Sequence, residues 1–326
     1  MMLGLRYDLR APAFGAPAEA LYRAAIEQCR WADELRFDFV TLSEHHGADD
    51  GYCPSPIVLG AAIAGATRDI RIQLMAYVVT LHHPLRAAED IAVLDLVSGG
   101  RLLVCLGAGY RESEFEMFGR DVHERAAAME QIVPLLKQAW TGEPFDFEGI
   151  EVRVTPRPLQ QPHPPLFLGG QTAAAARRAA RLADGFMPSI AEQSVQDAYH
   201  AERERLGLQP GLVFGGAGGP LFLHVADDPE AAWAKIAPHA LHETNSYLEW
   251  NAQGPDNVYS ALTDPGSLRA SGSYAVRTPD ECIAMAQSKG PMDALLFHPL
   301  MGGLDPDLAW ESLELFASKV LPVIRT

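Results

Sequence analysis

Three titratable side chains follow one another just after a short apolar run. The run covers 39–42, and after one serine come Glu44, His45 and His46. A strand that only fills a core should end in turn residues, because charged groups at its tip cost desolvation energy unless they face a cleft. We therefore expect chemistry at this tip. An imidazole, whose ordinary pKa lies near neutrality, would serve there as proton donor or acceptor.

The two histidines are adjacent, which limits what both can do. If the strand geometry continues, their side chains point to opposite faces and one of them faces the interior. The alternative for such a histidine is a hydrogen bond to a loop carbonyl, with no catalytic role. The neighbouring Glu44 favours the functional interpretation.

A second candidate is the segment LFLGGQTAAAARRAARLADG, in which two glycines and Gln-Thr stand between an apolar run and an alanine-rich helix. Gly169 and Gly170 would let the backbone approach an anion, and the Thr172 hydroxyl and the first free N–H groups of the helix could bind phosphate oxygens beside Gln171. The alternative is a capped helix that follows a tight turn.

A third glycine segment, LGAGYRESEF, begins at Leu106. It lacks the third glycine of a dinucleotide-binding fingerprint, and its acidic residues would repel a pyrophosphate, so we reject a Rossmann interpretation. Gly107 and Gly109 suit a backbone that passes close to something flat or bulky, with Ala108 and Tyr110 beside it. Simple turn glycines explain the same pattern.

Apolar runs alternate with longer segments of helical period along the whole chain, which is the pattern of parallel βα units. Eight runs fit strands, at 3–9, 39–42, 70–79, 102–106, 166–168, 185–188, 220–225 and 294–297. This count predicts an α/β fold, a (β/α)8 TIM barrel in a single domain over 1–326, with loop insertions after strands 4 and 7 at 141–165 and 251–276. We expect a hairpin and a proline-rich return in the first insertion and irregular structure in the second, and both are candidates for a lid. Reactive groups of such barrels lie at the carboxyl ends of the strands, which is where Glu44 and His45 fall.

The composition of the chain limits the classes of partner that it could bind. The net charge of −16 would repel nucleic acid and anionic membrane surfaces, although a local anion pocket stays possible. The first residues lack the apolar core of a secretion signal, and no run reaches the roughly 18 apolar residues of a membrane span, so we expect a cytoplasmic protein. The four cysteines are scattered without CxxC spacing, and we expect reduced thiols.

At this point the order of motifs resembles the bacterial luciferase-like, flavin-dependent monooxygenases. The matching pieces cover nearly the whole chain: EHHG at 44–47, HHPLRAAEDIAVLDLVSGGRL at 82–102, LGAGYRESEFEMFG at 106–119, PLQQPHPPLFLGGQT at 158–172, RRAARLADGF at 177–186 and LLFHPLMGG at 295–303. The block from 82 to 102 is the most specific of them, and the glycine pairs are the least.

The resemblance implies a barrel that binds reduced FMN, or a deazaflavin in some branches, and an enzyme that oxygenates a small organic substrate with O2. A separate flavin reductase would supply the reduced flavin, and related barrels commonly form homodimers. By position, the resemblance makes His45 the catalytic histidine and places Glu44 near the flavin.

Other residues are assigned to the flavin by the same resemblance. Met75, Ala76 and Tyr77 fall where the family has a bulge or a non-proline cis peptide beneath the ring, and Gly170, Gln171 and Thr172 fall on the phosphate-binding segment. One departure is that some relatives carry an arginine after strand four, where this chain has Ala108, with Arg111 a few residues later. The departure leaves the deazaflavin alternative open.

Two other classes of protein compete with this interpretation. A metal-dependent hydrolase could gather histidines 45, 82, 83 and 298 with Glu44 and Asp8, but metal sites need three or four ligands within about 2.2 Å of one ion and no spaced ligand set stands on a strand. A flavin-binding protein without catalysis would not need the glutamate and the histidine, which are both in place. We therefore expect an enzyme without a metal.

Overall fold

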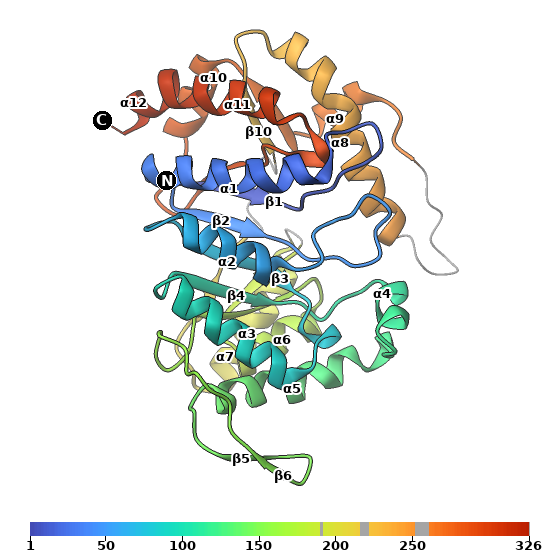
Figure 1. The fold of residues 1–326 in the computed structure, drawn as a ribbon, viewed down its shortest axis with the longest axis vertical. Helices are drawn as coiled ribbons and strands as arrows, with labels where there is room; N and C mark the ends of the chain where they lie inside the picture. Colours follow the sequence, from blue (N-terminus) through green and yellow to red (C-terminus); the bar gives the residue numbers. More distant parts are fainter. Residues whose placement is uncertain (190–191, 216–221, 252–260, 326) are drawn as a thin grey trace. The chain divides into compact units, whose positions relative to one another are not determined.

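The computed structural model describes residues 1–189, 192–215, 222–251 and 261–325 (Figure 1). The chain divides into two compact units. The first comprises Met1–Thr41, His46–Pro54 and Gly219–Thr326, and the second comprises Leu42–His45 and Ser55–Gly218.

The first unit contains parallel strands with helices between them. Its strands are β1 (Met2–Tyr7), β2 (Phe39–Leu42, whose last residue belongs to the second unit), β10 (Phe222–Val225), β11 (Tyr274–Arg277) and β12 (Ala294–Phe297), in the orders β12-β1-β2 and β10-β11. Its helices are α1 (Ala18–Glu34), α8 (Pro229–Asn251), α9 (Pro265–Ala270), α10 (Pro279–Gln287), α11 (Pro306–Leu315) and α12 (Leu321–Ile324), with short turns η3 (Met301–Gly303) and η4 (Phe316–Val320).

Local sequence explains why these elements form where they do. Thr278 caps α10 in a capping box with Glu281, so the first backbone N–H groups of this helix are bonded. One core cluster packs the β10–β11 pair against α8, with Phe222, Trp233 and Tyr274 among its members. Burial of these large rings is the main favourable contribution to the stability of this part of the unit.

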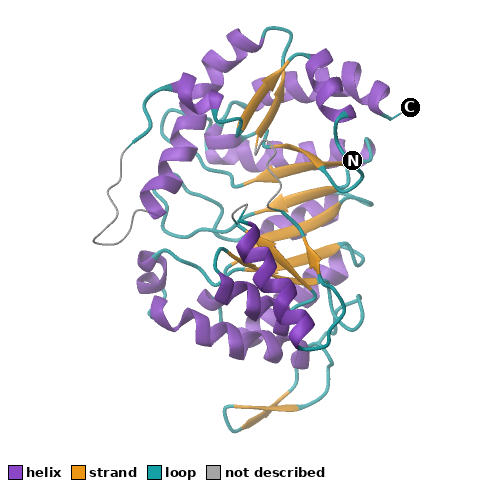
Figure 2. Ribbon diagram, turned by 180° about the vertical axis from the view of Figure 1, so that it is seen from behind, coloured by secondary structure: helices purple, strands orange, loops and turns teal. Residues whose placement is uncertain are grey.

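The second unit has five parallel strands in the order β3 (Arg71–Tyr77), β4 (Leu102–Leu106), β7 (Leu166–Gly170), β8 (Gly185–Pro188) and β9 (Leu212–Val213). In Figure 2 its strands run side by side with helices packed along them. The helices are α2 (Pro56–Ala66), α3 (Pro84–Val97), α4 (Glu112–Met117), α5 (Arg125–Ala139), α6 (Ala173–Leu182) and α7 (Gln193–Arg205), with turns η1 (Val79–Leu81) and η2 (Val122–Glu124). An antiparallel hairpin of β5 (Phe145–Phe147) and β6 (Ile150–Val152) projects from this unit (Figure 1).

The most specific sequence block, 82–102, has a structural role that its last arginine shows. The Arg101 guanidinium donates to the carbonyls of Ala64, Thr67, Ile70 and Ser98. Carbonyls at the end of a helix have no partner within the helix, and this side chain bonds those at the end of α2. Arg101 therefore clamps α2 and α3 to the start of β4.

Residues 158–165 were expected to belong to a lid, and the structure contradicts this. The Gln160 side chain donates to Asp95 at 2.6 Å and to the carbonyl of Leu102, the first residue of β4, at 2.8 Å. This segment therefore lies at the amino end of the strand, whereas reactive groups gather at carboxyl ends. The predicted hairpin before it is confirmed, and its Phe147 ring lies 5.7 Å from the His83 ring at the start of α3.

The eight predicted strands are present, with corrections at their ends. Strand one stops at Tyr7 instead of Leu9, because Leu9 has a positive φ of 54° that extended strands do not adopt. Strand seven was expected over 220–225. It is seen from Phe222, and residues 220 and 221 lie outside the described residues. The α/β class with parallel strands is confirmed.

The sequence reading also missed elements. It assigned no helix to α4 or α7, and α7 has the polar sequence QSVQDAYHAERER with few buried residues. The segment 251–276 was expected to be an irregular lid, and this is wrong for its described part, which holds α9 and most of β11. Residues 252–260 of that segment lie outside the described residues.

The predicted state of the cysteines agrees with their burial. Cys29, Cys53, Cys105 and Cys282 are all buried, and burial raises the pKa of Cys105 and of Cys282 to about 12. Such thiols are poor nucleophiles because the thiolate is the reactive form. Among the described residues, no helix is both long and apolar enough to cross a membrane.

We predict that His224 makes the protein sensitive to mild acid. Burial on β10, with a smaller effect of Lys235, lowers the pKa of His224 to about 4. The unfolded chain binds this proton near pH 6.5, so stability is present above that pH and is lost as the pH falls towards 4, by on the order of 3 kcal/mol. Urea unfolding at pH 7 and pH 4.5 should show a smaller loss for His224→Gln than for the parent chain.

The matched control is His123→Gln, which changes an exposed histidine of the other unit. This control should lose as much stability on acidification as the parent. An equal loss in the His224→Gln protein would show that another group carries the acid sensitivity.

Candidate active site

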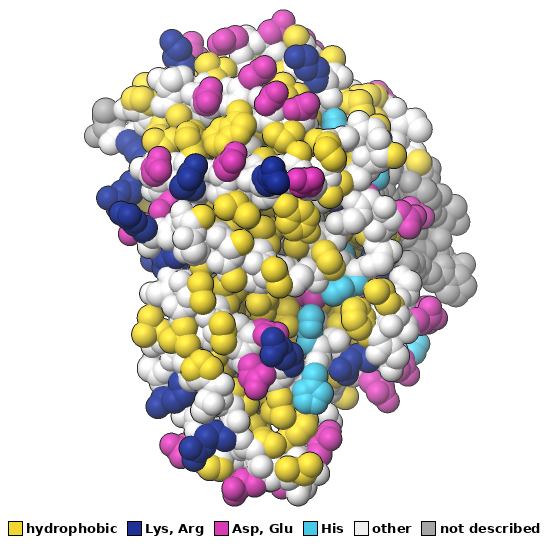
Figure 3. All heavy atoms as spheres, in the orientation of Figure 1, with side chains coloured by type: hydrophobic (Ala, Val, Ile, Leu, Met, Phe, Trp, Pro, Cys, Tyr) yellow, Lys and Arg dark blue, Asp and Glu magenta, His cyan; other side chains and the backbone are white. Residues whose placement is uncertain are grey.

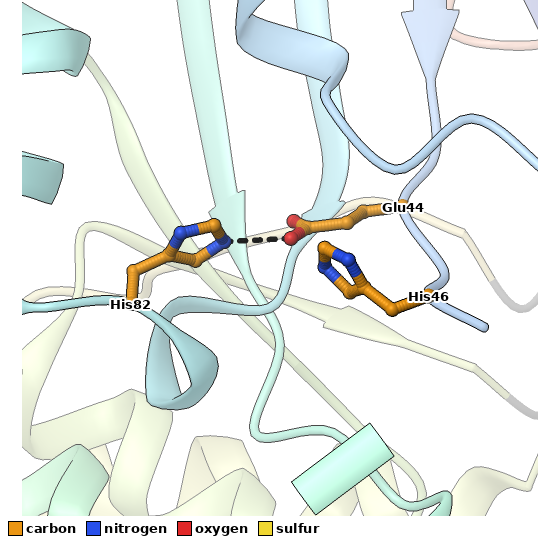
Figure 4. Close-up of side chains that lie close together, drawn as sticks. All are labelled: Glu44, His46 and His82. Carbon is orange, nitrogen blue, oxygen red and sulfur yellow. Dashed lines mark hydrogen bonds and ion pairs between the residues drawn. The ribbon is translucent and has the colours of Figure 1, made fainter. Parts of the chain in front are cut away.

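The Glu44 carboxylate is the centre of a polar network in the second unit. Its side chain has no exposed surface. One oxygen accepts the backbone N–H of Val78 at 2.7 Å, and the other lies 2.6 Å from His82 Nε2 (Figure 4). Because Val78 follows β3 directly, Glu44 ties the segment 42–45 to the exit of that strand.

His82 also stacks on Tyr77, the last residue of β3, with ring centroids 4.4 Å apart and an angle of 16° between the planes. Burial raises the pKa of Tyr77 well above its ordinary value, and the charge of Glu44 adds to this effect. The phenol therefore stays neutral. The stacked rings of Tyr77 and His82 and the Glu44 carboxylate together form one side of the polar network.

His45 is held by a second carboxylate. Its Nδ1 lies 2.8 Å from Glu114 Oε1, and Arg111 Nη1 donates to the same oxygen at 3.0 Å. A carboxylate can only accept, so the Nδ1 atom carries the proton in this pair. The other ring nitrogen, Nε2, lies 3.4 Å from the Tyr110 hydroxyl and is the atom left to exchange a proton.

The end of β3 has the geometry that the family resemblance predicted. The Met75–Ala76 peptide bond is cis although no proline follows it, and the pairing with β4 shifts register between Met75 and Tyr77. The backbone N–H of Gly107 donates to the Tyr77 carbonyl at 2.8 Å. Both predicted features, bulge and cis bond, are confirmed.

The glycines of the β4 exit serve the packing of the protein itself. A Cβ on Gly107 would lie 3.0 Å from the Cβ of Ala76. Gly109 has a positive φ of 70°, and a Cβ there would lie 2.8 Å from the Phe115 ring. The close neighbours that the sequence predicted for these glycines are therefore the end of β3 and α4.

The two glycines of the predicted phosphate-binding segment, at the end of β7, differ in whether packing requires them. A Cβ on Gly170 would meet the Cβ of Ala175 at 2.5 Å, so this glycine is required by α6, which corrects its assignment to anion approach. A Cβ on Gly169 would make ordinary contacts, the nearest being Cys105 Sγ at 3.5 Å. Packing therefore does not explain Gly169, and the capped-helix alternative is incomplete.

The donors at the start of α6 fit a phosphate group. Thr172 is the N-cap, and its Oγ1 accepts the Ala175 N–H at 3.2 Å while its own hydrogen stays available to donate. The N–H groups of Ala173 and Ala174 precede the first intrahelical bond, and Gln171 and Thr172 are exposed. A set of N–H and O–H donors at a helix N-terminus is suited to a doubly charged phosphate.

The departure at Ala108 is not compensated by Arg111. The Ala108 carbonyl accepts from Thr80 Oγ1 at 3.0 Å, and its side chain offers no charge. Arg111 is buried and directed to Glu114. The arginine that some relatives carry after strand four is therefore missing at Ala108. The nearby guanidinium of Arg111 instead bonds Glu114, the carboxylate that holds His45.

The structure brings together most of the predicted site. Glu44, His45 and the loops 75–77 and 107–110 are joined by the contacts above, and Gly169–Thr172 lie at the exit of β7, which pairs with β4. His46 belongs to the first unit. The alternation of the two histidines was expected only if the strand continued through them, and this condition is not met because the strand ends at Leu42.

The sequence analysis missed Glu114 and Arg111 as partners of His45, and it considered His82 only as a ligand in the competing metal-site interpretation. The signal for Glu114 was the acidic run at 112–114, which was used to argue against a pyrophosphate. An acidic helix turn directly after a strand that ends at the active face also predicts a partner for a histidine. The sequence could not show which of the acidic residues turns inward.

A sequence model described as luciferase-like monooxygenase matches residues 8–285. Flavin-dependent trigonelline monooxygenase, oxygenase component, of Acinetobacter baylyi is 28% identical over 158 residues, 46% of this chain and 44% of that protein. FMNH2-dependent dimethylsulfone monooxygenase of Pseudomonas putida is 31% identical over 161 residues, 47% of this chain and 44% of that protein. The chain spans about half the length of the curated relatives it matches.

Solved structures match over almost the full chain. Monooxygenase RslO1 from Streptomyces bottropensis is 24% identical with a TM-score of 0.77, and 99% of each chain is covered. An F420-dependent secondary alcohol dehydrogenase in complex with an F420-acetone adduct is 16% identical with a TM-score of 0.67, over 100% of this chain and 99% of that chain. At these identities the likeness shows a shared fold.

We predict that Glu114→Gln moves the proton on the His45 ring. An amide can turn its NH2 group towards Nδ1, which then accepts, and the ring proton moves to Nε2. The variant should also lose about 1–3 kcal/mol of stability, because Arg111 loses its charged acceptor. Nitrogen chemical shifts of the His45 ring should show the change of tautomer, and urea unfolding should show the loss.

The control is Glu116→Gln, an exposed position on the same short helix, which should leave both measurements unchanged. An unaltered His45 tautomer in the Glu114→Gln protein would contradict the orienting role of Glu114.

Proposed function

Because the chain belongs to the luciferase-like monooxygenase family, we propose that it uses reduced FMN and O2 to oxygenate a small organic substrate. The observation that carries the proposal is the buried network in which Glu44 and Glu114 hold His45 beside the bulged loop at Met75–Ala76. The name of the dimethylsulfone enzyme supports the choice of FMN. The relative named as an oxygenase component supports a separate reductase as the source of reduced flavin.

Different residues are assigned to the ring and to the phosphate of the cofactor. We assign the ring to the loops at Met75, Ala76 and Tyr77 and at Gly107, Ala108, Gly109 and Tyr110, and the phosphate to Gly169, Gly170, Gln171 and Thr172. When bound, reduced FMN supplies the electrons that activate O2. Gly170 acts indirectly, by letting α6 approach the strand so closely that its N-terminus stands beside Gly169.

His45 would manage protons at one atom. Glu114 engages Nδ1, so the neutral ring accepts a proton at Nε2 and the protonated ring donates it from the same place. Tyr110 lies against that nitrogen. Glu44 contributes by fixing the backbone at Val78, which keeps the β3 loop in place under the site.

A deazaflavin-dependent hydride transfer is the second candidate. The shared fold with the F420-dependent dehydrogenase favours it, and so does the lack of a strand-four arginine, because a phosphate site without that charge has no evident preference for FMN. The donors at the start of α6 suit either cofactor. We also propose that both compact units belong to a single domain over 1–326, because the family match runs through both of them.

A second copy of the chain is the protein partner that we propose. The helix α2 is apolar on all sides, with Leu59 and Ile63 buried and the Val58 side chain 68% exposed. Val93 and Val97 of α3 are exposed as well. Apolar side chains are visible over the place of these helices in Figure 3. An exposed apolar face is suited to a self-complementary contact around a two-fold axis.

We predict that His45→Ala lowers turnover by roughly 100-fold while flavin binding is retained, since general acid and base groups contribute about that much. Anaerobic titrations with FMN, reduced FMN and a deazaflavin would first establish the cofactor. The rate of O2 consumption and the peroxide yield would then be measured with panels of aldehydes, sulfones, sulfonates and terpenoid ketones.

His123→Ala, at an exposed histidine, serves as the control and should behave like the parent. Substrate oxygenation at the parental rate in the His45→Ala protein would contradict the catalytic assignment. Tight binding of the deazaflavin without binding of reduced FMN would replace the first candidate by the second.

We predict that the double substitution Val58→Glu and Val93→Glu converts a dimer into a monomer, because four charges would be buried at a two-fold contact. Light scattering coupled to gel filtration measures the mass directly. Ile150→Glu, which changes an equally exposed apolar residue on the hairpin, should leave the mass unchanged. A monomeric parent chain would contradict the homodimer.

A further inference from the structure

The first unit contains a second buried cluster of titratable groups, which the proposed reaction does not use. Asp8 follows β1, Glu243 lies on α8 and His298 follows β12. One possible ligand atom from each lies within 4.8 Å of the other two, and all three residues are buried. The sequence analysis named Asp8 and His298 among the residues that a metal-dependent hydrolase could gather. Glu243 stood inside a long helix and gave no signal.

The spacing within this cluster differs from that of the direct ion pairs nearby. Asp50 lies 2.6 Å from Arg10 Nη1 and 2.8 Å from His242 Nε2, as expected for charged hydrogen bonds. In contrast, His298 Nε2 is 3.3 Å from Asp8 Oδ1, and His298 Nδ1 is 3.5 Å from Glu243 Oε1. Two ligand atoms that share an ion at about 2.1 Å are separated by about this longer distance. Only one ring nitrogen can bind the ion, so one of the two spacings belongs to a pair of ligand atoms and the other to the nitrogen that does not bind.

The His298 ring is the second, independent observation. It is 1% exposed, and neither of its nitrogens makes a hydrogen bond with the part of the chain that the structure describes. A buried polar atom without a hydrogen bond costs about 1–3 kcal/mol. The His298 ring has two such nitrogens, one facing Asp8 and the other facing Glu243. A bound cation would satisfy the nitrogen that ligates it.

The formal charges of the side chains around the cluster indicate whether it would bind a cation or an anion. The carboxylates of Asp8, Asp50 and Glu243 meet the guanidinium groups of Arg6 and Arg10 in this buried region, so one negative charge is in excess when the imidazoles of His242 and His298 are counted as neutral. Arg10 is also enclosed by aromatic rings, with its Cζ 4.4 Å from the centroid of Trp250. An excess of buried negative charge favours a cation over an anion.

We propose that Asp8, Glu243 and His298 bind a divalent transition-metal ion, Zn²⁺ or Mn²⁺. One imidazole nitrogen and two carboxylate oxygens form a mixed donor set that both ions accept, with the remaining positions left to water. The ring nitrogen that does not bind faces a carboxylate, which is the usual orienting partner of a metal-bound histidine. The ion would join β1, β12 and α8 of the first unit.

The two guanidinium groups limit the affinity. Arg6 Nη2 lies 3.6 Å from Glu243 Oε1, and Arg10 Nε lies 3.4 Å from Asp8 Oδ2, so each competes with the ion for a carboxylate. The site is therefore weaker than one with the same ligands and no cation beside them. Its occupancy should depend on the free metal concentration, and chelation should remove the ion without unfolding the protein.

The test uses the full chain after treatment with a chelator. Isothermal titration with ZnCl2 and MnCl2, followed by metal analysis after gel filtration, should give about one bound equivalent. Removal of a ligand should weaken binding at least about tenfold in His298→Gln and Glu243→Gln. Titration with Co²⁺ adds a readout that needs no substitution, because its visible spectrum reports nitrogen and oxygen ligands.

Two control variants locate the ion. His224→Gln removes a buried histidine of the same unit, and His82→Gln removes a histidine of the other unit, and both should bind metal like the parent. Absence of stoichiometric binding to the parent chain would overturn the proposal, and so would loss of binding in His82→Gln. If the ligand variants fail to fold, the Co²⁺ spectrum of the parent decides. An aqua-ion spectrum overturns the proposal, and a shifted, intensified band supports it.

Discussion

The candidate active site depends on the full burial of the Glu44 carboxylate. A charge removed from water must be bonded on every side, because an uncompensated buried charge costs several kcal/mol. Glu44 meets this condition with the Val78 N–H and with His82, both of which belong to the segment after β3. The position of the next residue, His45, follows from this constraint, since its backbone cannot move without breaking those bonds.

In the second unit, the residues that stabilise the fold and the residues proposed for chemistry lie at opposite ends of the strands. The last arginine of the most specific motif, Arg101, bonds carbonyls at the amino ends of the strands and secures α2 and α3. The opposite ends carry Glu44, His45 and the glycine loops. This division is typical of α/β barrels, in which stability is concentrated at the amino ends and function at the carboxyl ends. It also explains why most of the clearest sequence block serves the fold, although its first residue, His82, bonds Glu44 in the candidate active site.

Histidines of this protein show how neighbours decide the role of one side chain. His224 is buried with no carboxylate partner among the described residues, and its pKa falls because burial disfavours the charged ring. His45 has one carboxylate, which fixes its tautomer and leaves the other nitrogen for chemistry. His298 lies between two carboxylates at a spacing that suits a shared ion. Burial is common to all three, and the number of acidic partners separates them.

Sequence by itself determined the α/β class, the eight strands and the position of His45, because apolar periodicity and strand ends are local properties of the chain. It also assigned Met75–Tyr77 correctly to a bulge, through the family resemblance. Only the tertiary structure decided that Glu114 and not its neighbours supports His45, that Gly170 serves α6, and that Glu243 joins Asp8 and His298. These facts depend on contacts between residues 5 to 290 positions apart, which no local pattern encodes.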